Sequence, residues 1–257
     1  IHHLVNALQH LGTPVTYLGD RDCPPLQIEG GKLRGGEVSV SGNISSQFLT
    51  ALLMSLPLAE QDSLIIVNGT QVSTPYVKLT LDCISRFGVE VNTIEQTYQV
   101  QGRQEYQSPG NYLIEGDASS ASYFLGAAAV AGNIKVSGLG RDSIQGALAF
   151  VDVLEKMGAR VKKLDQTIEV SKGPLTAVDV DLNHIPDTAM TIAMLALFAK
   201  GTTCIRNIYN WRVKETDRMT AMQTELRKLG AKVKTGSDYI LITPPERINE
   251  ATIDTYG

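Results

Sequence analysis

The chain has 257 residues, of which 43% are hydrophobic and 19% charged, an ordinary composition for a globular protein of one large or two modest domains. Its formal net charge of −4 excludes a general attraction to nucleic acid or acidic membranes, so an anionic ligand must be held by a few local cations. The longest strongly apolar run, residues 192–199, is too short to cross a bilayer, and three scattered cysteines without metal-ligand spacing predict a reducing cytoplasm and no metal site.

Four segments share one pattern, in which an amphipathic helix ends at a glycine and an alternating strand follows. Apolar residues recur at helical spacing before each glycine, and the period switches to two after it. Glycine at this point supplies the left-handed conformation that commonly ends a helix. A second strand follows each time after a short polar link, which predicts a strand pair behind every such helix. The glycines are Gly12, Gly88, Gly158 and Gly230, spaced 76, 70 and 72 residues apart.

Three more hydrophobic helices lie between these segments. They begin at Ser45, Ser119 and Asp187, residue types that cap helix N-termini. Apolar residues nearly encircle these helices, so we expect them to be buried inside a sheet-covered lobe. Each leads into a strand, namely SLIIVNG, NIKVSGL and TTCIRNIYN. The predicted unit is therefore β-α-β-α-β-β, about 70 residues long, with incomplete copies at both ends of the chain.

Two stretches in the first half place hydroxyl groups at helix starts. The helix at Ser45 opens with Ser45, Ser46 and Gln47, where free backbone N–H groups and the helix dipole favour a phosphate. Simple capping would need only one serine. Ser73 and Tyr76, in VSTPY, precede the next amphipathic helix, and from the residues alone a capping serine and a half-buried tyrosine are the favoured interpretation.

Two stretches in the second half concentrate charge. Asp187 opens a hydrophobic helix, where it could act as an N-cap, and a carboxylate beside a substrate hydroxyl could equally act as a general base. The string NWRVKETDR contains five residues that are ionised at neutral pH. From the residues alone, a solvated helix start with intrahelical ion pairs is favoured. The five are Arg212, Lys214, Glu215, Asp217 and Arg218.

Several long strings on this repeat resemble those of one family. SGNISSQFLTALLM, VSTPY, EGDASSASYFLGAAA, HIPDTAMT and IYNWRVKETDR occur in this order, and through them the whole chain resembles bacterial EPSP synthases. The resemblance implies an α/β, two-lobed enolpyruvyl transferase fold built from repeated βαβαββ units, with the active site between lobes that are each incomplete in this chain. Residues 1–114 would form the later part of the first lobe and residues 115–257 the beginning of the main part of the second. The crossing near Glu115 is expected to be short and strand-like.

The resemblance also implies roles for individual residues. Contacts to shikimate 3-phosphate would come from Ser45, Ser46, Gln47, Ser73, Tyr76, Asp187, Asn210 and Lys214. Contacts to phosphoenolpyruvate would come from Gln47 and Arg218. Asp187 is expected to be the catalytic base for the substrate's 5-hydroxyl, and Glu215 to act in proton transfer at the enol. No cofactor or metal is implied.

The reaction that the resemblance implies is transfer of the enolpyruvyl (1-carboxyvinyl) group from phosphoenolpyruvate to the 5-hydroxyl of shikimate 3-phosphate, with release of phosphate. It belongs to aromatic amino acid (chorismate) biosynthesis by a family that glyphosate targets. The expected protein is a cytoplasmic monomer without nucleic-acid or membrane partners. Because the chain lacks a start methionine and both terminal repeats are incomplete, we expect an internal piece that is catalytically incompetent on its own.

Two alternatives remain open. UDP-N-acetylglucosamine enolpyruvyltransferase shares the fold and the enol chemistry, although KETDR and SSQF fit EPSP synthase better. A non-catalytic α/β repeat scaffold that binds nucleic acid should display a basic stripe, and the only dense cation cluster here is mixed with carboxylates.

Overall fold

A computed structural model describes residues 1–256, and internal contacts divide the chain into two units, Ile1–Tyr112 and Leu113–Gly257. The division falls two residues before Glu115, where the sequence places its boundary. Each unit encloses its own buried hydrophobic core. The prediction of a strand-like crossing between the units is wrong, because residues 111–117 form no strand. Leu113 and Ile114 pair with no strand, and these two apolar residues are 82% and 84% exposed.

Unit 1 contains one complete copy of the predicted repeat. Its elements are α1 (His2–His10), β1 (Val15–Tyr17), β2 (Leu26–Ile28), β3 (Gly36–Ser41), α2 (Ser46–Ser55), η1 (Leu56–Leu58), β4 (Ser63–Asn68), α3 (Thr74–Arg86), β5 (Val91–Ile94) and β6 (Thr97–Val100). The run from β3 to β6 is the β-α-β-α-β-β unit, and α1, β1 and β2 belong to an incomplete copy before it.

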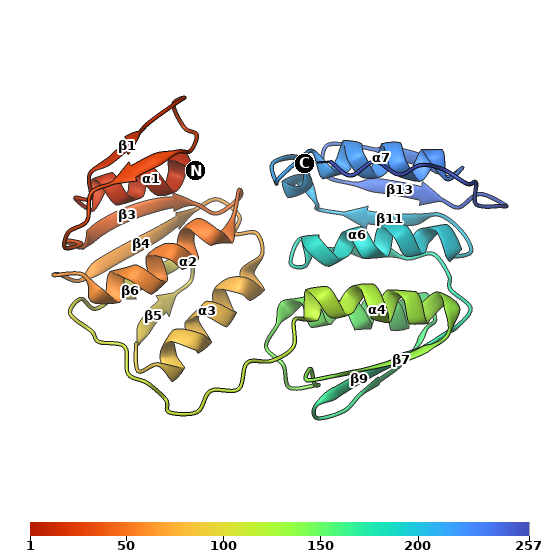
Figure 1. Cartoon of the computed structure of the whole chain (residues 1–257), viewed down its shortest axis with the longest axis horizontal. Helices are drawn as coiled ribbons and strands as arrows, with labels where there is room; N and C mark the ends of the chain where they lie inside the picture. The colour runs from red at the N-terminus through yellow and green to blue at the C-terminus, as the bar shows by residue number, and fades with distance from the viewer. Residues whose placement is uncertain (257) are drawn as a thin grey trace. The chain divides into compact units, whose positions relative to one another are not determined.

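The complete copy forms a four-stranded sheet in the order β3-β4-β6-β5, across which α2 lies (Figure 1). β3 and β4 run parallel, and the other neighbours are antiparallel. Alternate residues of the strands, such as Val38, Ile65 and Val100, enter one core with the leucines of α2. Leu52 and Leu53 are fully buried, and each such leucine stabilises the fold by about 1.5–3 kcal/mol relative to an exposed one.

Unit 2 contains a second complete copy of the repeat and a shorter one. Its elements are α4 (Ala118–Ala131), β7 (Asn133–Ser137), η2 (Gly146–Ala149), α5 (Phe150–Met157), β8 (Arg160–Lys163), β9 (Thr167–Ser171), β10 (Asp179–Asp181), α6 (Pro186–Leu195), η3 (Ala196–Phe198), β11 (Thr203–Arg206), η4 (Tyr209–Arg212), α7 (Arg218–Lys228), β12 (Lys232–Thr235) and β13 (Ile240–Thr243). The complete copy runs from β10 to β13 and forms a sheet in the order β10-β11-β13-β12, while the shorter one forms a sheet in the order β7-β9-β8.

All four predicted helix stops are confirmed. The glycines that end α1, α3, α5 and α7 have φ angles of +90°, +81°, +110° and +94°, values that other residues adopt only with strain. At Gly158 the lack of a side chain matters twice, because a Cβ there would also stand 2.6 Å from the carbonyl oxygen of Pro174. Each glycine therefore turns the chain from a helix into the strand pair behind it.

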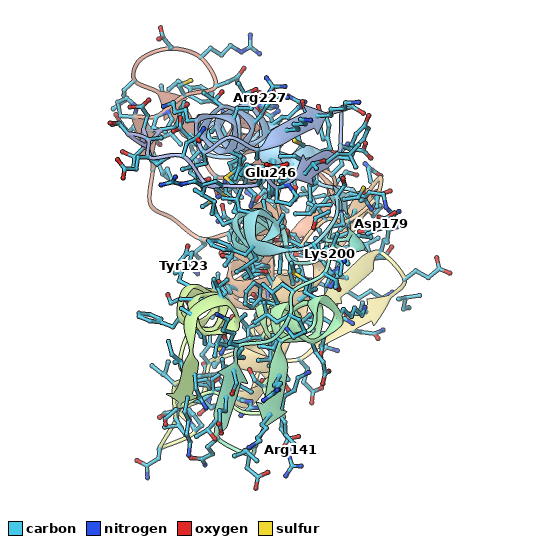
Figure 2. The ribbon with its side chains drawn as sticks, turned by 90° about the vertical axis from the view of Figure 1, so that its right-hand side faces the viewer. Tyr123, Arg141, Asp179, Lys200, Arg227 and Glu246 are labelled. Atoms are coloured by element: carbon cyan, nitrogen blue, oxygen red, sulfur yellow. The ribbon has the colours of Figure 1, made fainter. Side chains whose placement is uncertain are left out.

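The prediction that the hydrophobic helices are buried, by contrast, is wrong for one side of α4. α4 and α6 pack side by side, and α4 directs Ala121, Leu125 and Ala128 into the core. On its other side Tyr123 and Phe124 are 67% and 61% exposed, and Figure 2 shows Tyr123 projecting from the helix. Within residues 1–256, the sheets and helices of unit 2 cover only part of the circumference of α4.

Other expectations concern membranes and cysteines. No helix within residues 1–256 is long and apolar enough to cross a membrane. Cys83 and Cys204 are partly buried, whereas Cys23 is exposed.

Candidate active site

In unit 1 the two helices whose N-termini carry the candidate serines, α2 and α3, begin at one edge of the sheet. Because β3 and β4 are parallel, with Ser41 opposite Asn68, the helices that follow them both begin at the strands' carboxyl ends. The two loops touch, since Val72 N donates to Gly42 O at 2.9 Å. Gly42 permits this approach, because a Cβ would stand 3.1 Å from the Cα of Gln71. The N-termini of α2 and α3, where the positive ends of the helix dipoles lie, therefore face the same edge.

Ser45 is the N-cap of α2, as its position predicts. Its hydroxyl oxygen accepts from Gln47 N at 3.2 Å. Ser46 is buried and Gln47 is exposed. One serine thus satisfies the cap, and the second serine and the glutamine are not needed for it.

Ser73 occupies the N-cap position of α3 without capping it. Its backbone is left-handed, with φ +55° and ψ +37°, and its side chain makes no cap hydrogen bond although the residue is only 4% exposed. The interpretation of Ser73 as a plain capping serine is therefore wrong. Strained conformations of this kind persist where the surroundings enforce them and are common at functional sites. Tyr76, half-buried as expected, lies in the first turn of α3.

Unit 2 repeats this geometry with different side chains. β10 and β11 are parallel, so α6 and the segment leading into α7 also start from one sheet edge. Leu182 N donates to Arg206 O at 3.1 Å, and Asn183 Nδ2 donates to Asn207 O at 3.1 Å. The loops after the two strands are thereby joined.

Asp187 is not the N-cap of α6. The helix begins at Pro186, the N-cap is Ile185, and no side chain caps it. Proline suits the first helical position because it lacks the N–H that would otherwise be unpaired. Asp187 instead lies in the first turn with its side chain 34% exposed, where its charge is favourable at the positive end of the helix.

Asp187 and Glu215 converge on one arginine. Arg218 Nη1 lies 2.6 Å from Asp187 Oδ1, and Arg218 Nη2 lies 2.5 Å from Glu215 Oε2. The Arg218 side chain is only 14% exposed, whereas those of Asp187 and Glu215 are 34% and 73% exposed, so water screens the contact to Asp187 less than the contact to Glu215. Residues 213–217 are not helical, so the interpretation of this string as a solvated helix start is wrong for these five residues.

The contacts shift the pKa values of the cluster. The pKa of Glu215 is lowered, first by a hydrogen bond from its own backbone N–H and then by the Arg218 guanidinium. Burial alone would lower the pKa of Arg218, but its bonds to Asp187 and Glu215 outweigh burial and raise it. Glu215 is therefore ionised at neutral pH in this arrangement.

Asn210 is buried without partners for its side chain. It is 2% exposed, and neither its Oδ1 nor its Nδ2 has a hydrogen-bond partner within residues 1–256. Buried amides are almost always paired, so an unpaired one calls for an explanation such as a ligand. Four residues further on, the half-buried Lys214 makes no hydrogen bond or ion pair with the described part of the chain.

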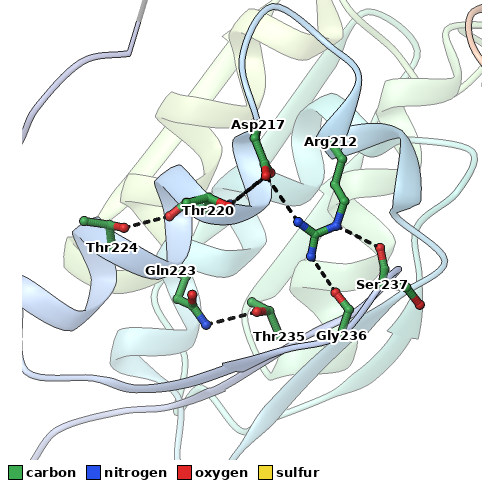
Figure 3. A network of polar contacts seen from close by, with 8 residues as sticks. All are labelled: Arg212, Asp217, Thr220, Gln223, Thr224, Thr235, Gly236 and Ser237. Carbon is green, nitrogen blue, oxygen red and sulfur yellow. Dashed lines mark hydrogen bonds and ion pairs between the residues drawn. The ribbon is translucent and has the colours of Figure 1, made fainter.

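The sequence did not reveal the two residues that hold this segment in place. Trp211 is fully buried, and its indole Nε1 donates to Pro186 O at 2.8 Å, next to Asp187. Arg212 binds a different element, the β12–β13 turn (Figure 3). The only signal in the sequence was that the chain's single tryptophan lies within the charged string NWRVKETDR.

Comparison with known proteins identifies the fold. The structure superposes on that of EPSP synthase from Acinetobacter baumannii with a TM-score of 0.74 and 21% identity, covering 100% of this chain and 59% of the other. The enolpyruvyl transferase NikO from Streptomyces tendae gives 0.74 and 18%, with 95% and 58% covered. The chain thus has the fold of the enolpyruvyl transferases.

Sequence comparison identifies the family. The sequence model of EPSP synthase (3-phosphoshikimate 1-carboxyvinyltransferase) matches residues 1–257. The 3-phosphoshikimate 1-carboxyvinyltransferases of Escherichia coli strains E24377A and HS are 59% identical to the chain over 259 residues. The chain belongs to the EPSP synthase family. It spans 60% of the length of these curated relatives.

Proposed function

We propose that the protein to which this chain belongs transfers the enolpyruvyl group of phosphoenolpyruvate to the 5-hydroxyl of shikimate 3-phosphate. The observation that carries the proposal is the convergence of Asp187 and Glu215 on Arg218, at the same sheet edge as the unpaired amide of Asn210. The cluster combines a carboxylate base, a second carboxylate and a partly buried cation that suits an anionic substrate. We further propose that the two units belong to the two lobes of the family's fold.

The reaction consists of an addition followed by an elimination. In the addition, the 5-hydroxyl oxygen bonds to C2 of phosphoenolpyruvate, its proton passes to Asp187, and C3 gains a proton. In the elimination, C3 loses a proton while the bond from C2 to the phosphate oxygen breaks and inorganic phosphate leaves. Glu215 is the group that we assign to proton transfer at C3. Holding two anions together in a fixed field of cations supplies most of the catalysis.

Arg218 links substrate binding to the protonation of Glu215. In the present arrangement its guanidinium is paired with two carboxylates. The carboxylate of phosphoenolpyruvate would compete for the same N–H donors. Once Arg218 turns to the substrate, Glu215 loses a partner that lowers its pKa, so its affinity for a proton rises. Substrate binding therefore prepares Glu215 to carry the proton that C3 requires.

The remaining candidates would bind substrate. Asn210 and Lys214 are assigned to shikimate 3-phosphate, the first because its amide has no partner among the described residues, the second because its ammonium group is uncommitted. In unit 1 we assign Ser45, Ser46, Gln47, Ser73 and Tyr76 to the same ligand, with Gln47 also contacting phosphoenolpyruvate. These residues lie at two helix N-termini, where Gln47 is exposed and Ser73 is strained, and such positions suit an anion. We place the protein in the cytoplasm as a monomer without a nucleic-acid partner.

Calorimetric titration tests the substrate. We expect the chain to bind shikimate 3-phosphate and not UDP-N-acetylglucosamine, and the reverse preference would overturn the assignment. Lys214→Gln should weaken binding about tenfold, the usual effect of losing one charge-assisted hydrogen bond. Arg206→Gln is the matched control, because it removes one positive charge from an exposed pair with Asp179 and should leave the affinity unchanged.

Phosphate release tests turnover. We expect the 257-residue chain to release no phosphate from a mixture of the two substrates. Release at the rate of a complete relative would show that the chain holds all the groups that the reaction needs.

A further inference from the structure

Arg212 makes three hydrogen bonds that fix the segment between η4 and α7. Its Nη2 donates to Gly236 O at 2.7 Å, its Nε to Ser237 O at 3.1 Å, and its Nη1 to Asp217 Oδ2 at 3.2 Å (Figure 3). The guanidinium thus binds the turn between β12 and β13 on one side and the residue before α7 on the other. A planar fork is needed to reach all three acceptors at once.

Asp217 passes this constraint on to α7. It is the N-cap of that helix, and its carboxylate accepts from Thr220 N at 3.1 Å and from Thr220 Oγ1 at 2.7 Å. The same carboxylate oxygen that binds Arg212 binds the threonine hydroxyl. Arg212 therefore helps to define where α7 begins, and with it the position of Arg218, the first residue of that helix.

The turn to which Arg212 binds is itself well fixed. Gly236 N donates to Tyr239 O at 3.0 Å, and Ile208 N donates to Asp238 O at 2.9 Å. A Cβ at Gly236 would stand 2.2 Å from the ring of Tyr239, so the aromatic ring packs directly on the glycine backbone. Arg212 is thus anchored on a closely packed turn and not on a free loop.

The opposite side of the segment is held by Trp211. Its bond to Pro186 O connects η4 to the start of α6. Residues 213–217 lack regular structure, and they run between these contacts and α7. The two arginines of the string NWRVKETDR therefore differ in kind. Arg212 directs its donors to backbone carbonyls and a capping carboxylate, whereas Arg218 faces Asp187 and Glu215.

We propose that Arg212 is a positioning residue, which sets the place of Lys214, Glu215 and Arg218 by holding residues 213–217 between the β12–β13 turn and α7. The part that concerns ligand affinity rests on the proposed function. Arg212 itself would not touch a substrate, because its three acceptors belong to the closely packed β12–β13 turn and to the N-cap of α7. The proposal distinguishes Arg212 from the neighbouring cations to which the family resemblance gives binding roles.

The test compares Arg212→Gln with Arg206→Gln, which removes the same charge from another ion pair of unit 2. Amide hydrogen exchange, read peptide by peptide, reports the mobility of residues 213–217 without any ligand. Titration with shikimate 3-phosphate reports affinity. For Arg212→Gln we expect exchange in that peptide to speed up about tenfold and the dissociation constant to rise about tenfold. For Arg206→Gln we expect neither change.

Four outcomes decide between positioning and simple stabilisation. Unchanged exchange in residues 213–217 overturns the proposal. A general loss of protection across unit 2 with unchanged affinity also overturns it, because it shows a structural role only. If Arg212→Gln does not fold, Arg212→Lys takes its place, since lysine keeps the charge near Asp217 but cannot reach both carbonyls. For Arg212→Lys the same faster exchange in residues 213–217 is expected. If the wild-type chain does not bind shikimate 3-phosphate, the proposed function fails, and the exchange data alone decide whether Arg212 holds the segment.

Discussion

Replacing Asn210 with leucine should make the chain more stable and a poorer binder. Leucine has the same branching and number of side-chain heavy atoms as asparagine and no polar atoms, so, although it is the larger residue, it can replace the amide in a site that is 2% exposed. An unpaired buried polar group costs about 1–3 kcal/mol, and the Asn210 amide has no partner within residues 1–256 for either of its polar atoms. We therefore expect Asn210→Leu to raise the free energy of unfolding by about 1–2 kcal/mol. For a unit of this size that raises the Tm by about 2–8 °C.

Thr203→Val provides the matched comparison. The Thr203 hydroxyl is also buried and without a partner among the described residues, but it lies on β11 and belongs to no candidate site. Both variants should be more stable than the wild type, because each removes a buried polar group that has no partner among the described residues. Only Asn210→Leu should lose shikimate 3-phosphate binding.

The assays are urea unfolding for stability and calorimetric titration for affinity, each on the same preparation. The stability reasoning is refuted if Asn210→Leu is less stable than the wild type, because removal of the amide then gains less than fitting the larger side chain costs. The binding assignment is refuted if Asn210→Leu binds the ligand as tightly as the wild type, because the amide then serves no binding role. Equal losses of affinity in both variants would point to a general effect of the substitutions.

Three further predictions concern the framework of unit 2. Trp211→Phe removes the indole donor from a buried bond and should lower the free energy of unfolding by about 1–3 kcal/mol in urea titration; no loss would mean that the bond is not formed. Gly140→Ala should lower the free energy of unfolding by more than about 2 kcal/mol, since its Cβ would stand 1.8 Å from the backbone oxygen of Asp165. Gly132→Ala should be tolerated, because a Cβ there would meet nothing within 4 Å. Equal thermal stabilities of the two variants would contradict this prediction. Asp117 is the N-cap of α4, and its pKa is lowered below the ordinary value of 3.8, chiefly by the Ser120 hydroxyl. The Asp117 carboxylate therefore stabilises the fold above pH 3.8. This stabilisation is lost as the pH falls through the lower pKa of the folded state. Asp117→Ala should therefore cost about 1 kcal/mol at pH 7 and progressively less toward pH 3, and a cost independent of pH would refute the linkage.

The repeat could be predicted from the sequence because its signals are local. A helical period, a glycine such as Gly158 and an alternating strand all lie within one short window, and the structure confirms them. The helix starts were less accurate. The N-cap positions are Asp117 in α4 and Ile185 in α6, each two residues before the start that composition suggested. Composition does not show which side chain, if any, reaches a free N–H group.

The anchors of the candidate site could not be predicted, because their partners are distant in sequence. Trp211 binds a carbonyl 25 residues away, and Arg212 binds one 24 residues away. Periodicity and composition carry no information about such pairs. The strain at Ser73 is likewise invisible in sequence, since serine gives no sign that it will adopt a left-handed conformation.

The edges of the sheets bear on how the protein avoids aggregation. Exposed edge strands can recruit strands of other molecules unless charge protects them. β8 carries Arg160 and two lysines, and β12 carries Lys232 and Lys234. β5, with the sequence VNTI, has no charge in it.

Acidic residues flank β5 instead. Glu90 precedes the strand and Glu95 follows it, and both are exposed, which is the position of residues that limit strand-to-strand aggregation. Neutralising both should leave the fold intact but raise light scattering in concentrated solution, whereas neutralising Glu155 and Glu246, elsewhere on the surface, should not. The protection of this sheet against self-association would then depend on two side chains just outside the strand.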